Sequence, residues 1–410
     1  MTARERWLVW GCLLAALLFR LGHLTGPLDE PLWRQTDTAY MALRMMDEMP
    51  PDVLRPKAPY RGTNDVKAAE FPVYPALAGL AYRAAGAERL ELARLITLLF
   101  FLGAVWFLGL AVAEMAGARA GWWTAVFYAL MPLGIGFSRM VHPDFSIIFG
   151  AHLFFYGLLR FLNRGGWGWY VASIAGATLA FLMKAPYAFY FGLPVAAWVL
   201  ARREGWTVRN FAALGFVLVI PLAAALWFNA HRIALEAPFE DSLLYPMKWT
   251  AESSANRFFG SLAQRLDGES WKLIARRLVY LIGTPAGLLL AAAGLLWPTR
   301  ADGRTRWALA ALVAGTALYT LLVFPMVAGG HEYYSLPFMA PVAALGGWTL
   351  ARLAARPRWG LALAGAALAL LAWGASVGLQ RGPYLSGDGF FSVDWQRVRA
   401  GEMIRDVTAP

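Results

Sequence analysis

The ionisable side chains that could do chemistry are confined to a few short stretches of a mainly apolar sequence. Asp37 could accept a proton, and Arg34 and Arg44 lie three residues before it and seven after it. On a helix these spacings bring both guanidinium groups to the face of Asp37, where they could hold its ionised form or a phosphate. Two interfacial arginines that bind lipid headgroups would give the same pattern.

Further candidates lie in other stretches, and each also has a purely structural interpretation. Asp144 follows Pro143 at a predicted helix start, where the helix dipole and free amides favour a carboxylate anyway. Lys184 could extend to a membrane surface. His331 begins a predicted helix whose N-terminus could bind a phosphate, and the aromatics after it could be interfacial. The full set of candidate binding residues is Arg34, Arg44, Glu70, Tyr74, Arg139, His142, Asp144, Lys184, His331, Tyr333 and Tyr334.

Composition places these residues in a membrane protein. The sequence is 59% hydrophobic and 15% charged, contains 19 Trp and has a mean hydropathy of +0.48. The net charge of +11 comes mostly from Arg placed singly or in pairs between apolar runs, which is typical of membrane topology and not of a nucleic-acid groove. A single cysteine, Cys12, excludes a disulfide within the chain and a cysteine-based metal site.

The apolar windows predict an all-α polytopic protein with about 11 transmembrane helices. A bilayer core needs about 20 apolar residues per helix. The first window lacks a signal-peptide cleavage site and is interpreted as a retained helix. Lys184 and Pro186 interrupt the fifth and sixth windows, which could form one kinked element or a tight helical hairpin; the hairpin is preferred. The windows lie near 7–24, 92–114, 120–137, 145–162, 168–184, 186–201, 210–229, 278–297, 307–326, 334–352 and 359–379.

The distribution of Arg predicts the orientation of these windows. With the N-terminus in the cytoplasm, the short outside turns hold only Arg139 and Lys184. Removal of the hairpin at Lys184 would invert every later loop against this bias. The inside segments hold Arg4 and Arg6; Arg119; Arg160 and Arg164; Arg202, Arg203 and Arg209; Arg300, Arg304 and Arg306; and Arg352, Arg356 and Arg358.

One transmembrane domain, 1–379, carries two long outside segments, 25–91 and 230–277, and a polar outside tail, 380–410. Amphipathic stretches in the first segment predict helices that lie along the membrane surface. The candidate polar residues all fall outside or at outer helix ends. A transporter would place its charges near mid-membrane, so this distribution favours an extracytoplasmic catalytic cavity.

Five short motifs carry a resemblance to a known group of enzymes. The first outside segment reads PLWRQTDTAYMALRMMDE and then AAEFPVYPALAGLAY; later motifs read SRMVHPDFSIIF, FLMKAP and GGHEYYSLPFMAP. In this order and at these spacings, over nearly the whole chain, they resemble the GT-C superfamily of glycosyltransferases. The most similar branch is the bacterial one related to protein O-mannosyltransferases and to the enzyme that adds aminoarabinose to lipid A (family 39 type).

The resemblance implies which carboxylate is the catalytic base. In that family it is the Asp of an Asp-Glu pair in the first loop, which aligns with Asp37. Thr38 replaces the Glu, as in a sub-branch with an Arg-Gln-X-Asp-Thr pattern. The pair Asp29-Glu30 competes for this role, but it lies close to the first helix and lacks the AYMALR segment that follows Asp37.

The resemblance also implies roles for other residues. Glu70 would bind a sugar or acceptor hydroxyl, although a helix-capping role is an alternative. Asp144 would line the cavity, and Lys184, in a Lys-X-Pro turn, would contact phosphate or sugar. His331 and Tyr333 stand where relatives carry Arg-Tyr, so the expected phosphate clamp departs from the family pattern.

The implied activity is inverting transfer of a sugar from a polyprenyl-phosphate donor to a cell-envelope acceptor, at the outer face of the bacterial inner membrane. The chemistry needs a base for the acceptor hydroxyl and stabilisation of the departing lipid phosphate, with no metal or other cofactor. The acceptor could be a lipid-linked glycan, a lipid or a protein. Two alternatives are a metal-dependent enzyme similar to oligosaccharyltransferases and a flippase of lipid-linked sugars.

Overall fold

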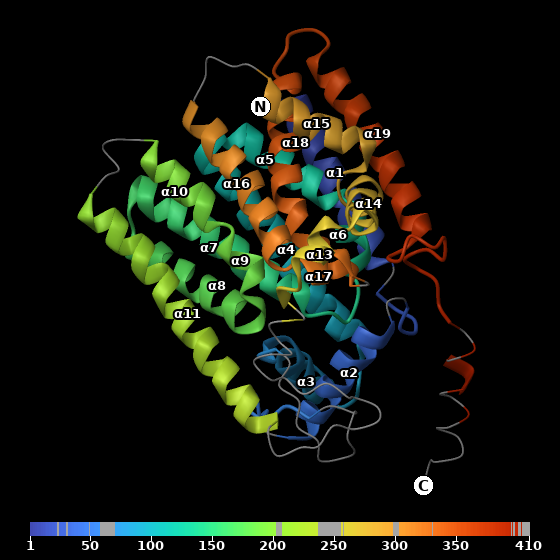
Figure 1. Cartoon of the computed structure of the whole chain (residues 1–410). Coiled ribbons are helices and arrows are strands. Elements are labelled where there is room, and N and C mark those ends of the chain that lie inside the picture. The colour runs from blue at the N-terminus through green and yellow to red at the C-terminus, as the bar shows by residue number, and fades with distance from the viewer. Residues whose placement is uncertain are drawn as a thin grey trace.

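The fold is helical throughout the part of the chain that the computed structural model describes (Figure 1). That part comprises residues 1–410 except 23, 30–31, 49, 58–69, 202–206, 237–255, 257, 298–302, 330, 395, 397, 401–402 and 404–410. The helices are α1 (Ala3–Leu21), α2 (Leu32–Asp47), α3 (Val73–Ala85), α4 (Leu90–Ala116), α5 (Ala118–Ala129), α6 (Pro132–Phe137), α7 (Asp144–Arg164), α8 (Trp167–Lys184), α9 (Pro186–Phe189), α10 (Gly192–Leu200), α11 (Val208–Glu236), α13 (Leu262–Leu266), α14 (Gly268–Arg277), the π-helix η2 (Leu278–Ile282), α15 (Thr284–Leu296), α16 (Gly303–Leu322), α17 (Phe324–Ala328), the 3₁₀ helix η3 (Glu332–Phe338), α18 (Met339–Ala354) and α19 (Gly360–Arg381).

Several of these helices are long and apolar enough to cross a bilayer, which indicates a multi-pass membrane protein. Within the described residues five helices meet this condition, or six if one bent pair forms a single span. All six coincide with windows expected from the sequence. They are α4, α7, α11, α16, α19 and the bent pair of Gly268–Ile282 and Thr284–Leu296.

The expected count of about 11 spans is not confirmed, because the other five windows form helices that are short, broken or charged. The window near 120–137 divides into α5 and α6 where Pro132 begins a new helix. Pro186 likewise separates α8 from α9 and α10. The helix α1 carries Arg4, Glu5, Arg6 and Arg20. The window near 334–352 begins in η3, and its α-helix α18 has 16 residues.

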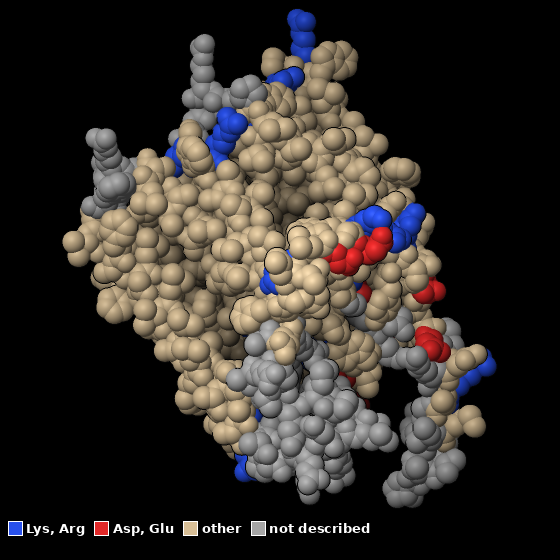
Figure 2. Space-filling model, viewed as in Figure 1, with Lys and Arg blue, Asp and Glu red and all other residues tan. Residues whose placement is uncertain are grey.

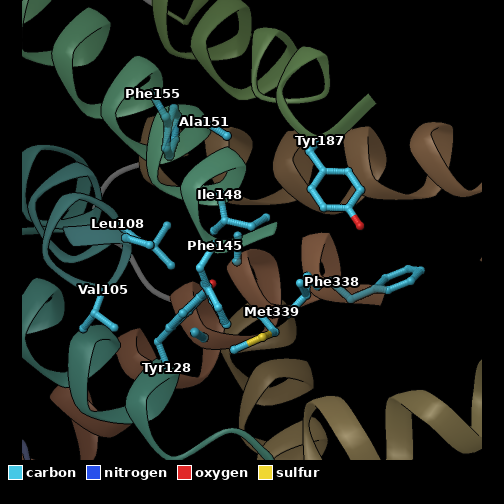
Figure 3. Packing of buried hydrophobic residues seen from close by; sticks show 14 of the residues in the cluster. Val105, Leu108, Tyr128, Phe145, Ile148, Ala151, Phe155, Tyr187, Phe338 and Met339 are labelled. Atoms are coloured by element: carbon cyan, nitrogen blue, oxygen red, sulfur yellow. The ribbon is translucent and has the colours of Figure 1, made fainter. Parts of the chain in front are cut away.

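The core lies where α4, α5, α7 and α18 pack together. Val105 and Leu108 of α4 face Phe145 and Ile148 of α7, and Met339 lies beside them at the start of α18 (Figure 3). These side chains are almost entirely buried. This packing fixes the first turn of α7, and with it the residue that begins α7.

Small residues let α7 and α8 approach closely. A Cβ on Gly150 of α7 would lie 2.6 Å from the carbonyl oxygen of Gly176 on α8, so only glycine fits there. Close backbone approach through small residues is the usual way in which helices pack in membranes. The first residue of α7 and the last residue of α8 are thereby held at one end of the same helix pair.

The chain reverses between α8 and α10, which confirms the helical hairpin interpretation. The Trp198 Nε1 of α10 donates to Asn163 at the end of α7, 2.8 Å away. The end of α10 has therefore returned to the end of the bundle where α8 begins. Lys184 and Pro186 lie at the opposite end of this hairpin.

The described parts of the segments expected inside gather at one end of the bundle, which we call the basic end. Arg202, Arg203 and Arg300 of those segments lie outside the described residues. On the face shown in Figure 2, its upper edge carries Lys and Arg side chains. Contacts between segments distant in sequence hold this end together. They are the contacts of Arg119 with Glu5, Arg160 with Glu114, Thr305 with the carbonyl of Met115, Trp198 with Asn163, and Arg304 with the carbonyl of Trp198.

The other end holds α2 and α3 (Figure 1), which are the helices that the amphipathic stretches of the first long segment predicted. Near this end the chain bends by 97° between η2 and α15. Thr284 follows the bend with a φ of 57°, an outlier for a β-branched residue. Packing against Gly374 of α19 holds this elbow, since a Cβ on Gly374 would lie 2.7 Å from Thr284 Cβ.

Candidate active site

A continuous chain of ion pairs joins α2, α7, α8 and the turn before α3. The Lys184 Nζ lies 2.5 Å from Asp144 Oδ1 and 3.4 Å from Glu70 Oε1. The Arg34 guanidinium lies 2.7 Å from the other Glu70 oxygen and 3.8 Å from Asp37 Oδ2. We call these five residues the ion-pair chain. Four separate stretches of the sequence therefore meet in one charged cluster.

Local structure explains how each stretch delivers its side chain. Pro143 precedes Asp144 and pre-sets the start of α7, while Lys184 is the last residue of α8 because Pro186 cannot continue the helix. Arg34 and Asp37 lie three residues apart on α2, so they share one face. This spacing was predicted from the sequence, and the contact between the two side chains is confirmed.

The ion-pair chain is almost entirely withdrawn from solvent. Asp37 and Asp144 are 2% and 0% exposed, and Glu70 is the most accessible member, with 18% of its side chain exposed. Three carboxylates face two cations, so the five side chains of the ion-pair chain together carry one formal negative charge. Burial alone would lower the pKa of Arg34, but the negative charges of Glu70 and Asp37 outweigh burial and raise that pKa above its ordinary value.

His142 extends the ion-pair chain at Asp144. Its Nδ1 lies 2.8 Å from Asp144 Oδ2, and the side chain is 1% exposed. Burial lowers the pKa of His142 below its ordinary value of 6.5, and the neighbouring Asp144 offsets only part of this effect. The imidazole is therefore neutral at pH 7, and its Nε2 has no hydrogen-bond partner among the described residues.

Aromatic rings surround the ammonium group of Lys184. Its Nζ lies 4.7 Å from the ring centres of Tyr333 and Tyr334 and 4.8 Å from that of Tyr187. A cation held over several aromatic faces is favoured, most of all where water is excluded. The Tyr187 hydroxyl donates to the Tyr333 carbonyl at 2.7 Å and fixes η3 against the end of α8.

His331 lies at the edge of this aromatic wall, and its expected setting is corrected. Its ring centre is 5.4 Å from those of Trp33 and Tyr333. It precedes the seven-residue 3₁₀ helix η3, and the α-helix α18 begins only at Met339. The α-helix N-terminus that was expected to assist phosphate binding at His331 is therefore eight residues further on.

Three predicted binding residues lie apart from both the ion-pair chain and the aromatic wall. Arg44 pairs with Glu48 at 3.7 Å, one turn further along α2. A separation of seven residues spans about 10 Å of helix, and Arg44 extends away from Asp37. The Tyr74 hydroxyl donates to the Ala93 carbonyl at 2.8 Å within the core. Arg139 pairs with Asp29 at 2.5 Å.

Sequence reasoning missed Tyr187 and Gln35. Tyr187 follows the Lys-Ala-Pro turn directly, so its position beside Lys184 was the only available signal. Gln35 lies inside the Arg-Gln-X-Asp-Thr pattern, and its buried amide accepts a hydrogen bond from the Val141 N–H at 3.0 Å. Neither residue is ionisable near neutral pH, and for that reason a search for charges overlooks both.

The carboxylates of the ion-pair chain are arranged for cations of the protein itself. Among the described residues, no group of three or more His, Cys, Asp or Glu is placed to hold a metal ion. Glu70 and Asp144 each pair with Lys184, and Glu70 and Asp37 each pair with Arg34. The arrangement offers a buried carboxylate, two cations and an aromatic wall around one of them.

Two comparisons with known proteins confirm the resemblance to GT-C glycosyltransferases. Residues 67–228 match the family model of dolichyl-phosphate-mannose-protein mannosyltransferases. The structure resembles that of ArnT from Cupriavidus metallidurans bound to undecaprenyl phosphate, with a TM-score of 0.64 and 18% identity over 90% of this chain. It also resembles the archaeal oligosaccharyltransferase AglB from Archaeoglobus fulgidus in complex with an inhibitory peptide and a dolichol-phosphate, with a TM-score of 0.62 and 13% identity over 100% of this chain.

The likeness to these two structures is one of fold. The chain spans 64% of the length of the ArnT chain and 59% of that of the AglB chain. Comparison with curated protein sequences gave no match. The GT-C fold is thus established, while donor and acceptor have to be argued from the site.

Replacement of Lys184 by Met should destabilise the protein by about 3 to 5 kcal/mol, because it leaves Asp144 buried without its cation. Adding Asp144→Asn should restore part of this loss. The free energy of unfolding in detergent is the measurement. Lys272→Met is the matched control, because the Lys272–Glu269 pair is largely exposed, with a predicted cost below about 1 kcal/mol. Equal losses for the two lysines would contradict the buried pair.

The lowered pKa of His142 predicts a stability change with pH. The unfolded chain binds a proton near pH 6.5 and the folded chain only at lower pH, so protonation favours unfolding. This contribution is fully present well above the ordinary pKa of 6.5 and is lost as the pH falls below that value. The thermal midpoint of the wild type should therefore fall more steeply over this range than that of His142→Gln. Parallel curves would show that His142 does not titrate in this way.

Proposed function

We propose that the chain is an inverting glycosyltransferase that moves a sugar from a polyprenyl-phosphate donor to a cell-envelope acceptor at the outer face of the bacterial inner membrane. The observation that carries the proposal is the buried Asp37 beside Arg34, in a cluster with Lys184, on the GT-C fold. A base and two cations are the parts that this transfer requires.

Asp37 acts as the general base. Its carboxylate removes the proton of the acceptor hydroxyl while the acceptor oxygen forms a bond to the anomeric carbon. The bond between that carbon and the phosphate oxygen breaks on the opposite face, and its electron pair stays on the phosphate. The product sugar is inverted, and the lipid phosphate leaves as an anion. Asp37 is released for the next turnover when it passes its proton to water.

Arg34 and Lys184 stabilise the departing phosphate. Both now bind Glu70, at 2.7 Å and 3.4 Å, and a phosphate oxygen could occupy the same position between the two cations. Glu70 is also the most exposed member of the ion-pair chain. Because His331 stands where relatives carry Arg, it adds at most a hydrogen bond. Lys184 and Arg34 supply the positive charge that binds the phosphate.

Glu70 and Asp144 serve the sugar side of the reaction. Once a phosphate takes its cations, the Glu70 carboxylate is available to accept hydrogen bonds from sugar or acceptor hydroxyl groups. Asp144 stays between Lys184 and His142 and keeps both groups in place, at 2.5 Å and 2.8 Å. The unpartnered Nε2 of His142 can exchange a hydrogen bond with a hydroxyl group.

An apolar cavity of about 430 Å³ supports a lipid-linked donor. It lies between the elbow, α15, α16 and α18, and its wall includes Phe338 of η3 and Leu345 of α18. Phe338 belongs to the same short helix as Tyr333 and Tyr334, which contact Lys184. An isoprenoid chain in this cavity would leave its phosphate on the side of the ion-pair chain.

The orientation is part of the proposal. The basic end faces the cytoplasm by the positive-inside rule, so the ion-pair chain faces outward. The acceptor is a lipid, a lipid-linked glycan or a protein that meets the site from that side. The metal-dependent mechanism and the flippase remain the competing proposals.

Asp37→Asn should lower transfer about 100-fold to 10,000-fold and leave donor binding intact, because the amide keeps the shape but cannot accept a proton. The assay supplies radiolabelled polyprenyl-phosphate sugars to purified protein with membrane acceptors and follows the new glycosidic bond. Asp29→Asn is the matched control and should be milder. A reversed order of the two variants would reject Asp37 as base. Loss of transfer on adding a chelator would favour the metal-dependent alternative, and a protein that forms no bond would favour the flippase.

Orientation is tested with single cysteines in a Cys12→Ser background. Ser386 and Ala355 are both exposed, the first beyond α19 and the second in the turn after α18 at the basic end. In intact cells an impermeant thiol reagent should label Ser386→Cys and leave Ala355→Cys unmodified. In lysed cells both should react, which serves as the control. The opposite pattern in intact cells would place the site in the cytoplasm.

A further inference from the structure

A second polar network lies beside the ion-pair chain and contains none of its members. Arg139, just before α7, pairs with Asp29 at 2.5 Å, and the two side chains are 3% and 6% exposed. Asp29 in turn accepts from the Gln35 amide, through its carbonyl at 2.6 Å and through its carboxylate at 3.2 Å. Arg139 was expected to bind substrate, but its guanidinium is committed to protein groups.

Gln35 connects this network to the helix that carries the proposed base. It is fully buried on α2, between Arg34 and Asp37 in the sequence. Its Oε1 accepts from the Val141 N–H, next to His142, at 3.0 Å. One amide therefore joins α2 to the turn before α7 and to the segment before α2. We call Arg139, Asp29 and Gln35 the tether.

The far side of the tether is held by residues after α19. Arg139 donates to the Phe390 carbonyl, and its guanidinium carbon lies 4.0 Å from the centre of the Phe391 ring. We call Gly382–Phe391 the strap. The strap folds back on α19, because the Phe390 N–H donates to the Leu379 carbonyl at 2.9 Å.

Phe390 anchors the strap in the protein interior. Its side chain is 0% exposed and contacts the Phe137 ring edge-on, with ring centres 6.0 Å apart. A glycine at position 136 makes room for it, since a Cβ there would lie 2.3 Å from Phe390 Cδ1. The buried Phe390 ring, the glycine that makes room for it and the Arg139 guanidinium over the Phe391 ring together indicate a specific packing contact.

We infer that Arg139 and Gln35 are positioning residues and that the strap acts through them to fix α2, and with it Asp37, against the turn before α7. The inference rests on the proposed function for its catalytic consequence. A general base must lie within about 0.5 Å of its productive position, and a displacement of about 1 Å can cost about 100-fold in rate. The tether supplies that restraint without contact with substrate.

The experiment compares Phe390→Ala, Phe390→Leu, Gln35→Ala and the double variant Phe390→Ala/Gln35→Ala in the transfer assay. Phe390→Ala and Gln35→Ala should each lower kcat about 10-fold to 100-fold and leave the donor KM within about threefold. Phe390→Leu, which still fills the contact, should recover most of the rate. The double variant should be no slower than the slower single variant, because both changes act on one tether.

Phe155→Ala is the matched control. Phe155 lies in the middle of α7 (Figure 3), 11 residues after Asp144, which begins that helix. It is likewise 0% exposed, and its ring stacks on that of Phe191 with the ring centres 4.8 Å apart. Its loss should lower stability with little change in kcat. A multiplicative loss in the double variant, or an equal kcat loss in Phe155→Ala, would overturn the inference.

Hydrogen exchange separates failure of the tether from failure of the proposed function, because it needs no activity. Amides of α2 should exchange about 10-fold faster in Phe390→Ala and in Gln35→Ala than in the wild type or in Phe155→Ala. Unchanged exchange in α2 would reject the tether. A wild type without transferase activity, but with this exchange pattern, would reject the function and keep the tether.

Discussion

The ion pair between Lys184 and Asp144 is the interaction on which the end of the molecule opposite the basic end depends. Both groups are withdrawn from water, a cost that can exceed their mutual attraction unless further polar contacts are made. Those contacts are present: His142 at the second carboxylate oxygen, Glu70 at the ammonium group, and three tyrosine rings around it. The pair holds together α7, α8 and, through the tyrosines, η3.

The ion-pair chain contains one more carboxylate than cations, and this excess determines how an anion could bind there. A resting site with one formal negative charge repels an anion unless the anion replaces a carboxylate, and Glu70 is the accessible one. Under the proposed function, a phosphate bound to Arg34 would occupy its guanidinium, and the Asp37 carboxylate would accept the proton of the acceptor hydroxyl. The tether inferred to keep Asp37 in place is separate from this exchange, because the contacts of Arg139 and Gln35 among the described residues are with protein groups outside the ion-pair chain.

Sequence reasoning identified the charged groups of the site where local geometry dominates. Asp37 with Arg34 follows from helix spacing, and Asp144 and Lys184 follow from the prolines that begin and end their helices. Arg44 was misplaced because face sharing on a helix does not decide whether a long side chain turns towards one neighbour or another, and Glu48 was the nearer acid.

Tertiary packing decided the features that no local pattern could predict. Tyr74 was expected to bind substrate, but its hydroxyl is buried in the core, where it donates a hydrogen bond to the Ala93 carbonyl. The count of spans rested on the hydropathy of windows, and hydropathy does not record that Pro132 begins a new helix within the window near 120–137 or that the α-helix α18 has only 16 residues. The strap, distant in sequence from the site, carries no charge that a search for chemistry would notice.

The elbow at Thr284 has a consequence for the surrounding lipid. After the 97° bend, α15 has 13 residues and rises about 20 Å, roughly a third less than the bilayer core. Hydrophobic mismatch of this size is met by local thinning of the bilayer or by tilt of neighbouring helices. A thinned annulus beside α15 would bring lipid headgroups closer to the midplane on the side of the apolar cavity. The acyl-chain length of the surrounding lipid should therefore affect the region beside α15 and the apolar cavity, in addition to the side chains that line them.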